Sequence, residues 1–260
     1  MAFTTLKIAD EGAIRTVTIN RPDKLNALNG EVIAELTAAF AQIATDDGVR
    51  AVVLTGSGEK AFVAGADIAE MSGLTPLQLR DFSRRGQALM LAIERLGKPV
   101  IAAINGFALG GGFELAMACH LRIAAETAKI GQPEVKLGLI PRFGGTQRLL
   151  RLAGRGAPLE LCLTGEPIDA ARAYQLGLVN RIVPIAELAG ESSALAAKLA
   201  ALAPQALRGV IDAVANGGEC AIDQGLDYET HVFAVLASSE DMREGTSAFL
   251  EKRKPAFAGR

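Results

Sequence analysis

The first part of the chain alternates between strand-like and helix-like spacing of apolar residues. Ile14–Ile19 alternates apolar and polar positions, which predicts a half-buried strand. Apolar residues then recur at helical spacing from Val32 to Ile43, and Asn29 before them is a residue type that favours helix starts. Ala51–Leu54 is a short apolar run that predicts a buried strand. The order strand, helix, strand indicates an α/β arrangement.

The same alternation continues through the middle of the chain. Thr75-Pro76 has the residue types that begin a helix, and the apolar spacing after it stays helical to Leu96. Pro99–Ile104 predicts a buried strand, and a glycine run and a second helical pattern follow it. A further strand is expected at Leu178–Val183. These elements place the core in the α/β class, although they do not give the strand order.

The pattern changes after about Pro184, where Ala-rich helical stretches follow one another as far as Arg253. We therefore expect two parts, an α/β core over residues 1–195 and a helical subdomain over residues 196–260. The helical part is expected to pack on the core and on a neighbouring subunit.

The glycine and histidine contents limit the kinds of active site that the chain can form. Glycine is frequent, with 28 residues among 260, and histidine is scarce, since only His120 and His231 are present. A His-rich zinc site or a relay of several imidazoles therefore has almost nothing to draw on. The net charge of −2 and the absence of tryptophan argue against a basic, aromatic surface for nucleic acid.

The remaining composition predicts a soluble cytoplasmic protein. Cys119, Cys162 and Cys220 are far apart and form no CxxC motif, which is typical of reduced thiols. The N-terminus has neither the apolar core of a signal peptide nor the arginines of a transit peptide. The apolar stretch Pro99–Leu121 contains four glycines and Glu114, which argues against a membrane span.

Glu114 is the only charged residue of that stretch if His120 is neutral. A carboxyl group among apolar residues and glycines is desolvated, and desolvation raises its pKa toward the range useful for proton transfer. The alternative is that Glu114 caps the helix after Gly110–Gly112, where its charge favours the helix dipole. The charge pattern alone leaves both readings open.

Two glycine-bearing turns could present backbone N–H groups to a ligand. Gly110–Gly112 stands between a predicted strand and helix, where such donors can hold a phosphate or an oxyanion. The run is not a dinucleotide fingerprint, because Leu115 occupies the last glycine position. The alternative role for these glycines is tight helix–strand packing. In the second turn, Val63–Ile68, Asp67 is expected as a helix cap rather than as a catalytic group.

A third candidate lies in the turn Gly131–Glu134, where glycine and proline could aim the carboxylate of Glu134. The alternative is a solvated glutamate beside Lys136. We expect His120 and His231 to be structural or exposed.

Six segments together resemble the crotonase (enoyl-CoA hydratase/isomerase) superfamily, in the family's order and over nearly the whole chain. They are Arg21–Leu28, Ala61–Ile68, Asn105–Ala116, Gly131–Glu134, Gly144–Leu149 and Phe249–Phe257. The resemblance implies a spiral of ββα units with a helical C-terminal trimerisation region, assembled as a trimer or hexamer. It also implies an acyl-CoA thioester substrate and a role in fatty acid and lipid metabolism.

The resemblance also implies site residues. Backbone N–H groups of Ala66 and Gly111 match the oxyanion hole, which holds the thioester oxygen. The positions that match CoA-binding residues are Lys24, Leu25, Ala27, Ala64, Asp67 and Ile68, with Phe249 and Lys252 in the tail, often from the adjacent subunit.

Within the family, hydratases keep two glutamates, and they match Glu114 and Glu134, 20 residues apart here. Related isomerases generally keep one, so hydration is favoured over isomerisation. As a hypothesis, Glu134 supplies the C2 proton and Glu114 orients and deprotonates the water, with no metal or redox cofactor. Arg142-Phe143 stands where many hydratases carry small residues, which leaves the acyl-chain preference open.

A non-enzymatic alternative remains, because some relatives bind RNA. The best candidate surface for it is a modest basic set that also fits a solvated helix face. This set is Arg80, Arg84, Arg85, Arg95 and Lys98.

Overall fold

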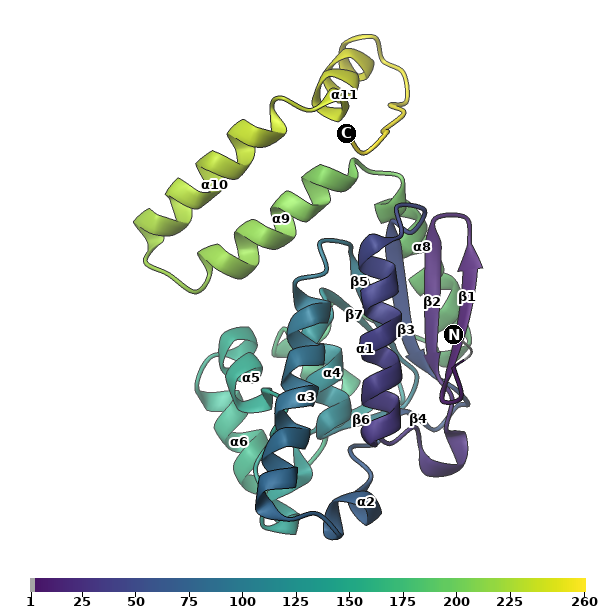
Figure 1. The fold of residues 1–260 in the computed structure, drawn as a ribbon, viewed down its shortest axis with the longest axis vertical. Helices are drawn as coiled ribbons and strands as arrows, with labels where there is room; N and C mark the ends of the chain where they lie inside the picture. The colour runs from purple at the N-terminus through teal and green to yellow at the C-terminus, as the bar shows by residue number, and fades with distance from the viewer. Residues whose placement is uncertain (1–2) are drawn as a thin grey trace.

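The computed structural model describes residues 3–260, which form two sheets surrounded by helices (Figure 1). The larger sheet has the strand order β1-β2-β3-β5-β7-β10. Only the β1–β2 pair is antiparallel, and the other neighbours in this sheet are parallel. Its strands are β1 (Leu6–Glu11), β2 (Ile14–Ile19), β3 (Ala51–Gly56), β5 (Val100–Ile104), β7 (Leu121–Ala125) and β10 (Arg181–Val183).

The smaller sheet has the order β4-β6-β8-β9, in which β4, β6 and β8 are parallel and β9 is antiparallel to β8. Its strands are β4 (Ala61–Val63), β6 (Phe107–Leu109), β8 (Lys129–Gly131) and β9 (Ile168–Asp169).

From β3 to β8, consecutive strands alternate between the two sheets, and helices follow each pair. β3 and β4 precede α2 (Ile68–Ser72) and α3 (Pro76–Glu94), and β5 and β6 precede α4 (Gly111–Ala118). β7 and β8 precede η2 (Pro133–Leu137), α5 (Gly145–Ala153) and α6 (Gly156–Thr164). This repetition is the spiral of ββα units that the resemblance implies, and the expected fold is confirmed.

Glycines allow the chain to turn sharply from one sheet to the other. A Cβ atom at Gly106 would lie 2.2 Å from the carbonyl oxygen of Lys60, and one at Gly56 would lie 2.2 Å from that of Phe62. The buried side chain of Asn105 donates to the carbonyl oxygens of Gly56 and Gly58 at 3.0 and 2.6 Å. These contacts fix the corner that leads from the large sheet toward the candidate site.

The central strands β3, β5 and β7 of the large sheet are buried on both faces, as expected for parallel strands. In β3, Val52 and Leu54 belong to the core beneath α1 (Gly30–Thr45) and α3, whereas Val53 points to the other face. That second face is covered by α8 (Leu188–Ala200) through residues such as Leu188 and Ala196. The remaining elements of the core region are η1 (Pro22–Lys24), α7 (Ala170–Gln175) and η3 (Ile185–Glu187).

The C-terminal region contains α9 (Pro204–Gly217), α10 (Ile222–Leu236) and α11 (Glu240–Leu250). In Figure 1, α9 and α10 lie side by side and project away from the sheets, and α11 lies at the top. The domain boundary predicted between residues 195 and 196 falls inside α8, and it stays a prediction.

Most of the local predictions agree with the structure. Asn29 accepts a hydrogen bond from the N–H of Val32 at 2.9 Å, and Thr75 forms a capping box with Gln78. The strand expected at Leu178–Val183 is shorter, because the N–H of Leu178 donates to Ala173 and closes α7.

No single helix of residues 3–260 is long and apolar enough to cross a membrane. One pair bent by 105°, Ile185–Ala200 with Pro204–Gly217, reaches the required length and composition only when taken together.

Candidate active site

The candidate site lies where the three parallel strands of the small sheet end. The segment Ala64–Ala66 follows β4, Gly110 and α4 follow β6, and Glu134 follows β8. Because β6 pairs with both β4 and β8 in parallel, their carboxyl ends meet at one edge. Ligands of open α/β sheets bind at such edges. Sheet topology thus brings together three segments that are far apart in sequence.

The two predicted oxyanion donors come from adjacent strand ends. Leu28 pairs with Ala66 through the carbonyl of Gly65 and the N–H of Asp67, so the N–H of Ala66 points away from Leu28. Gly111 is the first residue of α4, where the N–H groups lie at the positive end of the helix dipole. That both amides bind one oxyanion stays a prediction, and N–H groups in such positions can bind one.

Gly112 brings these donors close together. A Cβ atom there would lie 2.0 Å from the carbonyl oxygen of Val63, so only glycine allows α4 to approach β4 this closely. The packing role of the glycine run and its ligand-binding role are therefore compatible.

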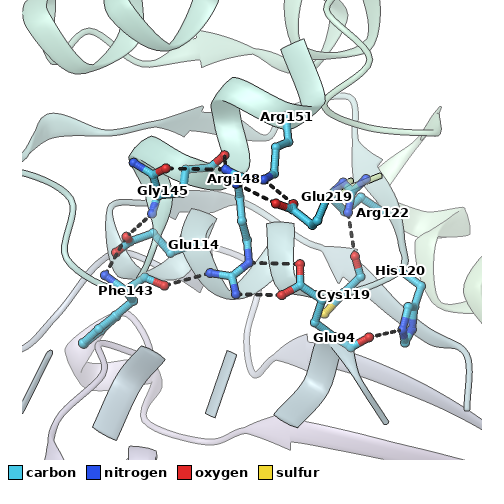
Figure 2. A network of polar contacts seen from close by, with 11 residues as sticks. Glu94, Glu114, Cys119, His120, Arg122, Phe143, Gly145, Arg148, Arg151 and Glu219 are labelled. Carbon is cyan, nitrogen blue, oxygen red and sulfur yellow. Dashed lines mark hydrogen bonds and ion pairs between the residues drawn. The ribbon is translucent and has the colours of Figure 1, made fainter. Parts of the chain in front are cut away.

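Glu114 is fully buried in α4. Its Oε1 accepts hydrogen bonds from the N–H groups of Phe143 and Gly145, at 2.7 and 2.6 Å (Figure 2). Its Oε2 is buried and has no hydrogen-bond partner among the described residues. Since the carboxylate binds another loop and not the first turn of α4, the alternative of a helix cap does not hold.

Glu134 is also buried, with 8% of its surface exposed. The side-chain amide of Gln132 lies 3.0 and 3.1 Å from its two carboxyl oxygens. The amide is satisfied when its nitrogen faces Glu134 and donates to both carboxyl oxygens. Lys136 pairs with Glu166 at 2.7 Å, so Glu134 is not the solvated partner of a lysine.

The two carboxyl groups share an environment that favours the protonated form. Burial raises the pKa of Glu114 to about 7, the N–H of Gly145 opposes this change, and the charge of Glu134 adds to it. Burial also raises the pKa of Glu134, and the positive charge of Arg142 opposes that change. Two carboxyl groups with raised pKa values suit proton transfer near neutral pH.

Arg142 and Phe143 form one wall of the site. The Phe143 ring is fully buried, with its centroid 5.6 Å from that of Phe82. The guanidinium carbon of Arg142 lies 4.9 Å from the Phe143 centroid and 5.3 Å from the Phe82 centroid. Room for the Phe143 ring exists because residue 86 is glycine, where a Cβ atom would lie 2.2 Å from the ring.

The groove residues implied by the resemblance are only partly brought together. Leu25 accepts a hydrogen bond from the N–H of Ala64 at 3.0 Å, which aligns the segment Lys24–Ala27 with the Ala64–Ile68 turn. Asp67 precedes α2, as expected of a helix cap, but its carboxylate pairs with Arg21 at 3.1 Å. Phe249 and Lys252 are exposed at α11, which lies at the opposite end of the long axis from α2 (Figure 1).

The structure assigns structural roles to several other candidates. His120 is half-buried, accepts from the N–H of Val100 and lies 3.2 Å from the carbonyl oxygen of Glu94, whereas His231 is exposed. In the predicted basic surface, Lys98 donates to two carbonyl oxygens at the end of α1 and Arg80 pairs with Asp81.

Sequence reasoning missed the loop that holds Glu114. The N–H groups of Phe143 and Gly145 carry no side-chain signal, and the glycines Gly144-Gly145 predict only a turn and part of a family motif. Gln132 likewise carries no signal beyond its place in the turn Gly131–Glu134. No group of three or more His, Cys, Asp or Glu residues in the range 3–260 could hold a metal ion.

Comparisons with known proteins agree with this geometry. The family model described as Enoyl-CoA hydratase/isomerase matches residues 9–260. The short-chain-enoyl-CoA hydratase of Clostridium acetobutylicum is 45% identical over 254 residues, covering 98% of this chain and 97% of the relative. The crotonyl-CoA hydratase of Syntrophomonas wolfei is 44% identical over 257 residues, covering 99% of each.

A solved structure gives the same result. The crystal structure of enoyl-CoA hydratase from Bacillus anthracis is 40% identical, covers 99% of this chain and 100% of its own, and superimposes with a TM-score of 0.96. The matched range, the identities and the shared fold together show that this chain belongs to the enoyl-CoA hydratase/isomerase family.

Proposed function

We propose that the chain is a hydro-lyase that adds water across the 2,3 double bond of a trans-2-enoyl-CoA, giving a 3-hydroxyacyl-CoA in a reversible reaction. The observation that carries this proposal is the convergence of two buried glutamates, Glu114 and Glu134, on one strand edge. The names of the relatives, a short-chain-enoyl-CoA hydratase and a crotonyl-CoA hydratase, support the same reaction. An isomerase shifts a double bond with one carboxylate, so the pair favours hydration.

The N–H groups of Ala66 and Gly111 would bind the thioester oxygen. When water adds at C3, negative charge develops on this oxygen as an enolate forms. The N-terminus of α4 adds the positive end of its dipole at that point. Removing one such donor typically costs about 2.7–4 kcal/mol of transition-state stabilisation.

Glu114 would act as the base for water. Its Oε1 is held by two N–H groups, which leaves the unpartnered Oε2 to accept the proton. The water oxygen bonds to C3, and its proton passes to Glu114. Burial raises the pKa of Glu134, which favours the protonated form that donates its proton to C2. Glu114 ends protonated and Glu134 ionised, and exchange with solvent restores the pair.

This reaction uses no cofactor, because CoA is part of the substrate and acid–base groups suffice. Lys24, Leu25, Ala27, Ala64, Asp67 and Ile68 would line the CoA groove. We place the reaction in the cytoplasm, as the scattered cysteines predict.

The proposal includes a homo-trimer or a hexamer. The C-terminal helices expose large apolar residues, among them Val214 and Phe233 at 72% each and Phe249 at 82%. Apolar surface of this kind marks an interface. Phe249 and Lys252, which lie far from the site in their own chain, would then contact CoA bound to a neighbouring subunit.

The test is a crotonyl-CoA assay that follows loss of the conjugated thioester absorbance. The unmodified enzyme should turn over, and Glu114→Gln and Glu134→Gln should each lose about 10²–10⁴-fold in kcat. Glu166→Gln, an exposed glutamate paired with Lys136, is the matched control and should keep its activity. Full activity in either site variant would refute the two-glutamate mechanism.

A further inference from the structure

The loop before α5 holds Glu114 in an unusual way. Phe143 and Gly145 both donate to the same oxygen, Glu114 Oε1. Gly144, which stands between them, has a φ of +104°, in the region that favours glycine. The N–H of Phe143 belongs to the peptide group between residues 142 and 143, and the N–H of Gly145 belongs to the one between residues 144 and 145. The middle peptide, which joins Phe143 to Gly144, lies between them. A contact that fixes the orientation of this middle peptide therefore also orients both donors.

Arg148 holds the middle peptide. Its Nη1 donates to the carbonyl oxygen of Phe143 at 2.9 Å, and a Cβ atom on Gly144 would lie 2.3 Å from the same nitrogen. The arginine is therefore packed directly against the loop. Figure 2 shows its guanidinium between Phe143 on one side and Glu94 on the other.

The guanidinium is itself fixed by an ion pair. Its Nε and Nη2 donate to the two carboxylate oxygens of Glu94 at 3.3 and 2.9 Å, a bidentate geometry that lysine cannot reproduce. Only 11% of the arginine side chain is exposed. The carbonyl group of Glu94 lies 3.2 Å from Nε2 of His120, whose Nδ1 accepts from the start of β5. The loop is thus tied through α3 to the large sheet.

We propose that Arg148 is a positioning residue for Glu114, which acts by locking the loop Phe143–Gly145 so that both amides point at one carboxylate oxygen. This inference rests on the proposed function and on Glu114 as the base. Without Arg148 the middle peptide is free to rotate, and the charged form of Glu114 loses its donors. Water held by Oε2 then lies out of line with C3.

The pH dependence of activity should report this role. The N–H groups of Gly145 and Phe143 lower the pKa of Glu114 against the effect of burial, so their loss raises that pKa above about 7. The charged groups that act on Glu114 from other elements are Glu134 of η2 and Arg142 of the loop, and the titratable thiol of Cys162 in α6 in turn responds to the charge of Glu114. All three remain in an Arg148 variant.

The experiment compares Arg148→Met with Arg151→Met on crotonyl-CoA. Arg151 lies one turn further along α5 and pairs with the exposed Glu219, without contacting the loop (Figure 2). We expect Arg148→Met to lower kcat by about 10²-fold with KM close to the unmodified enzyme, and to move the acid limb of kcat to higher pH. Arg151→Met should change neither.

Glu94→Gln provides a second variant in case Arg148→Met does not fold. It removes the ion pair but leaves the bond to Phe143, so the same shift should appear to a smaller extent. In the double variant, kcat should be close to that of Arg148→Met alone. A lower kcat with an unchanged acid limb in the folded variants would overturn the positioning role. Absence of turnover by the unmodified enzyme would instead refute the proposed function.

Discussion

Glu134 occupies the space that a side chain at residue 110 would need. An ideal Cβ atom on Gly110 would lie 2.6 Å from Glu134 Oε1. Gly110 also has a φ of +51° and a ψ of −124°, a conformation that residues with a Cβ rarely adopt. The N-cap position of α4 therefore leaves room for the carboxyl group of Glu134 only because it is glycine.

Gly110→Ala should abolish most of the activity, because the new methyl group displaces the Glu134 carboxyl from C2. We expect a loss of about 10²-fold or more in kcat on crotonyl-CoA. Gly12→Ala is the matched control, since Gly12 has a φ of +58° and open space around it. The control should lose about 1–2 kcal/mol of stability in urea denaturation and keep its kcat. Equal losses of kcat would show that strain alone is responsible.

The glycine run shows which parts of the candidate site can be predicted from the sequence. A carboxylate in an apolar segment could be identified from the chain alone, and so could glycines between a strand and a helix. Their convergence could not, because it depends on β4, β6 and β8 pairing in parallel. These strands have three residues each, too few for a periodic signal, so none of them was predicted.

The hydrogen bonds of Glu114 show a second limit of prediction from the sequence. Its hydrogen-bond donors are backbone N–H groups of residues 143 and 145, and any residue except proline carries such a group. The partner of Arg148 is Glu94, 54 residues earlier, and the packing of α3 and α5 against α4 brings the pair together. The longer elements, by contrast, followed from local rules such as the Asn29 and Thr75 caps.

The stability of the unmodified protein should depend on pH through Glu114. Burial raises the pKa of Glu114 from 4.5 to about 7, so between these values the native state binds more protons than the unfolded chain. The free energy of unfolding therefore falls as pH rises across this window, by up to about 3 kcal/mol.

Glu114→Gln removes this dependence, so the variant should gain stability relative to the unmodified protein as pH rises from 5 to 8. Urea denaturation of both proteins at the two pH values measures the change. A constant difference between the proteins would mean that Glu114 does not carry a raised pKa.

The positive charge of Arg142 should shift the pH at which Glu114 titrates. Its guanidinium lowers the pKa of both Glu114 and Glu134, and it is stacked on the rings of Phe82 and Phe143. Arg142→Gln should therefore move the acid limb of kcat to higher pH, and Arg142→Lys should restore part of the original profile. Arg85→Gln is the control, because Arg85 lies 5.8 Å from the Phe82 centroid and is exposed. An identical shift in both Gln variants would trace the effect to Phe82 packing.

Assembly through the C-terminal helices should be weakened by a charged side chain at position 233 of α10. Phe233 of α10 is 72% exposed in the single chain, and a glutamate there would be desolvated if a second subunit covers it. Phe233→Glu should therefore release smaller species, measured by light scattering after gel filtration. Gln224→Glu adds the same charge at an exposed polar position of α10 and should leave the assembly intact. Because Phe249 and Lys252 are proposed to reach a neighbouring subunit, dissociation should raise KM for crotonyl-CoA. A monomeric unmodified protein with full activity would contradict both the assembly and the shared site.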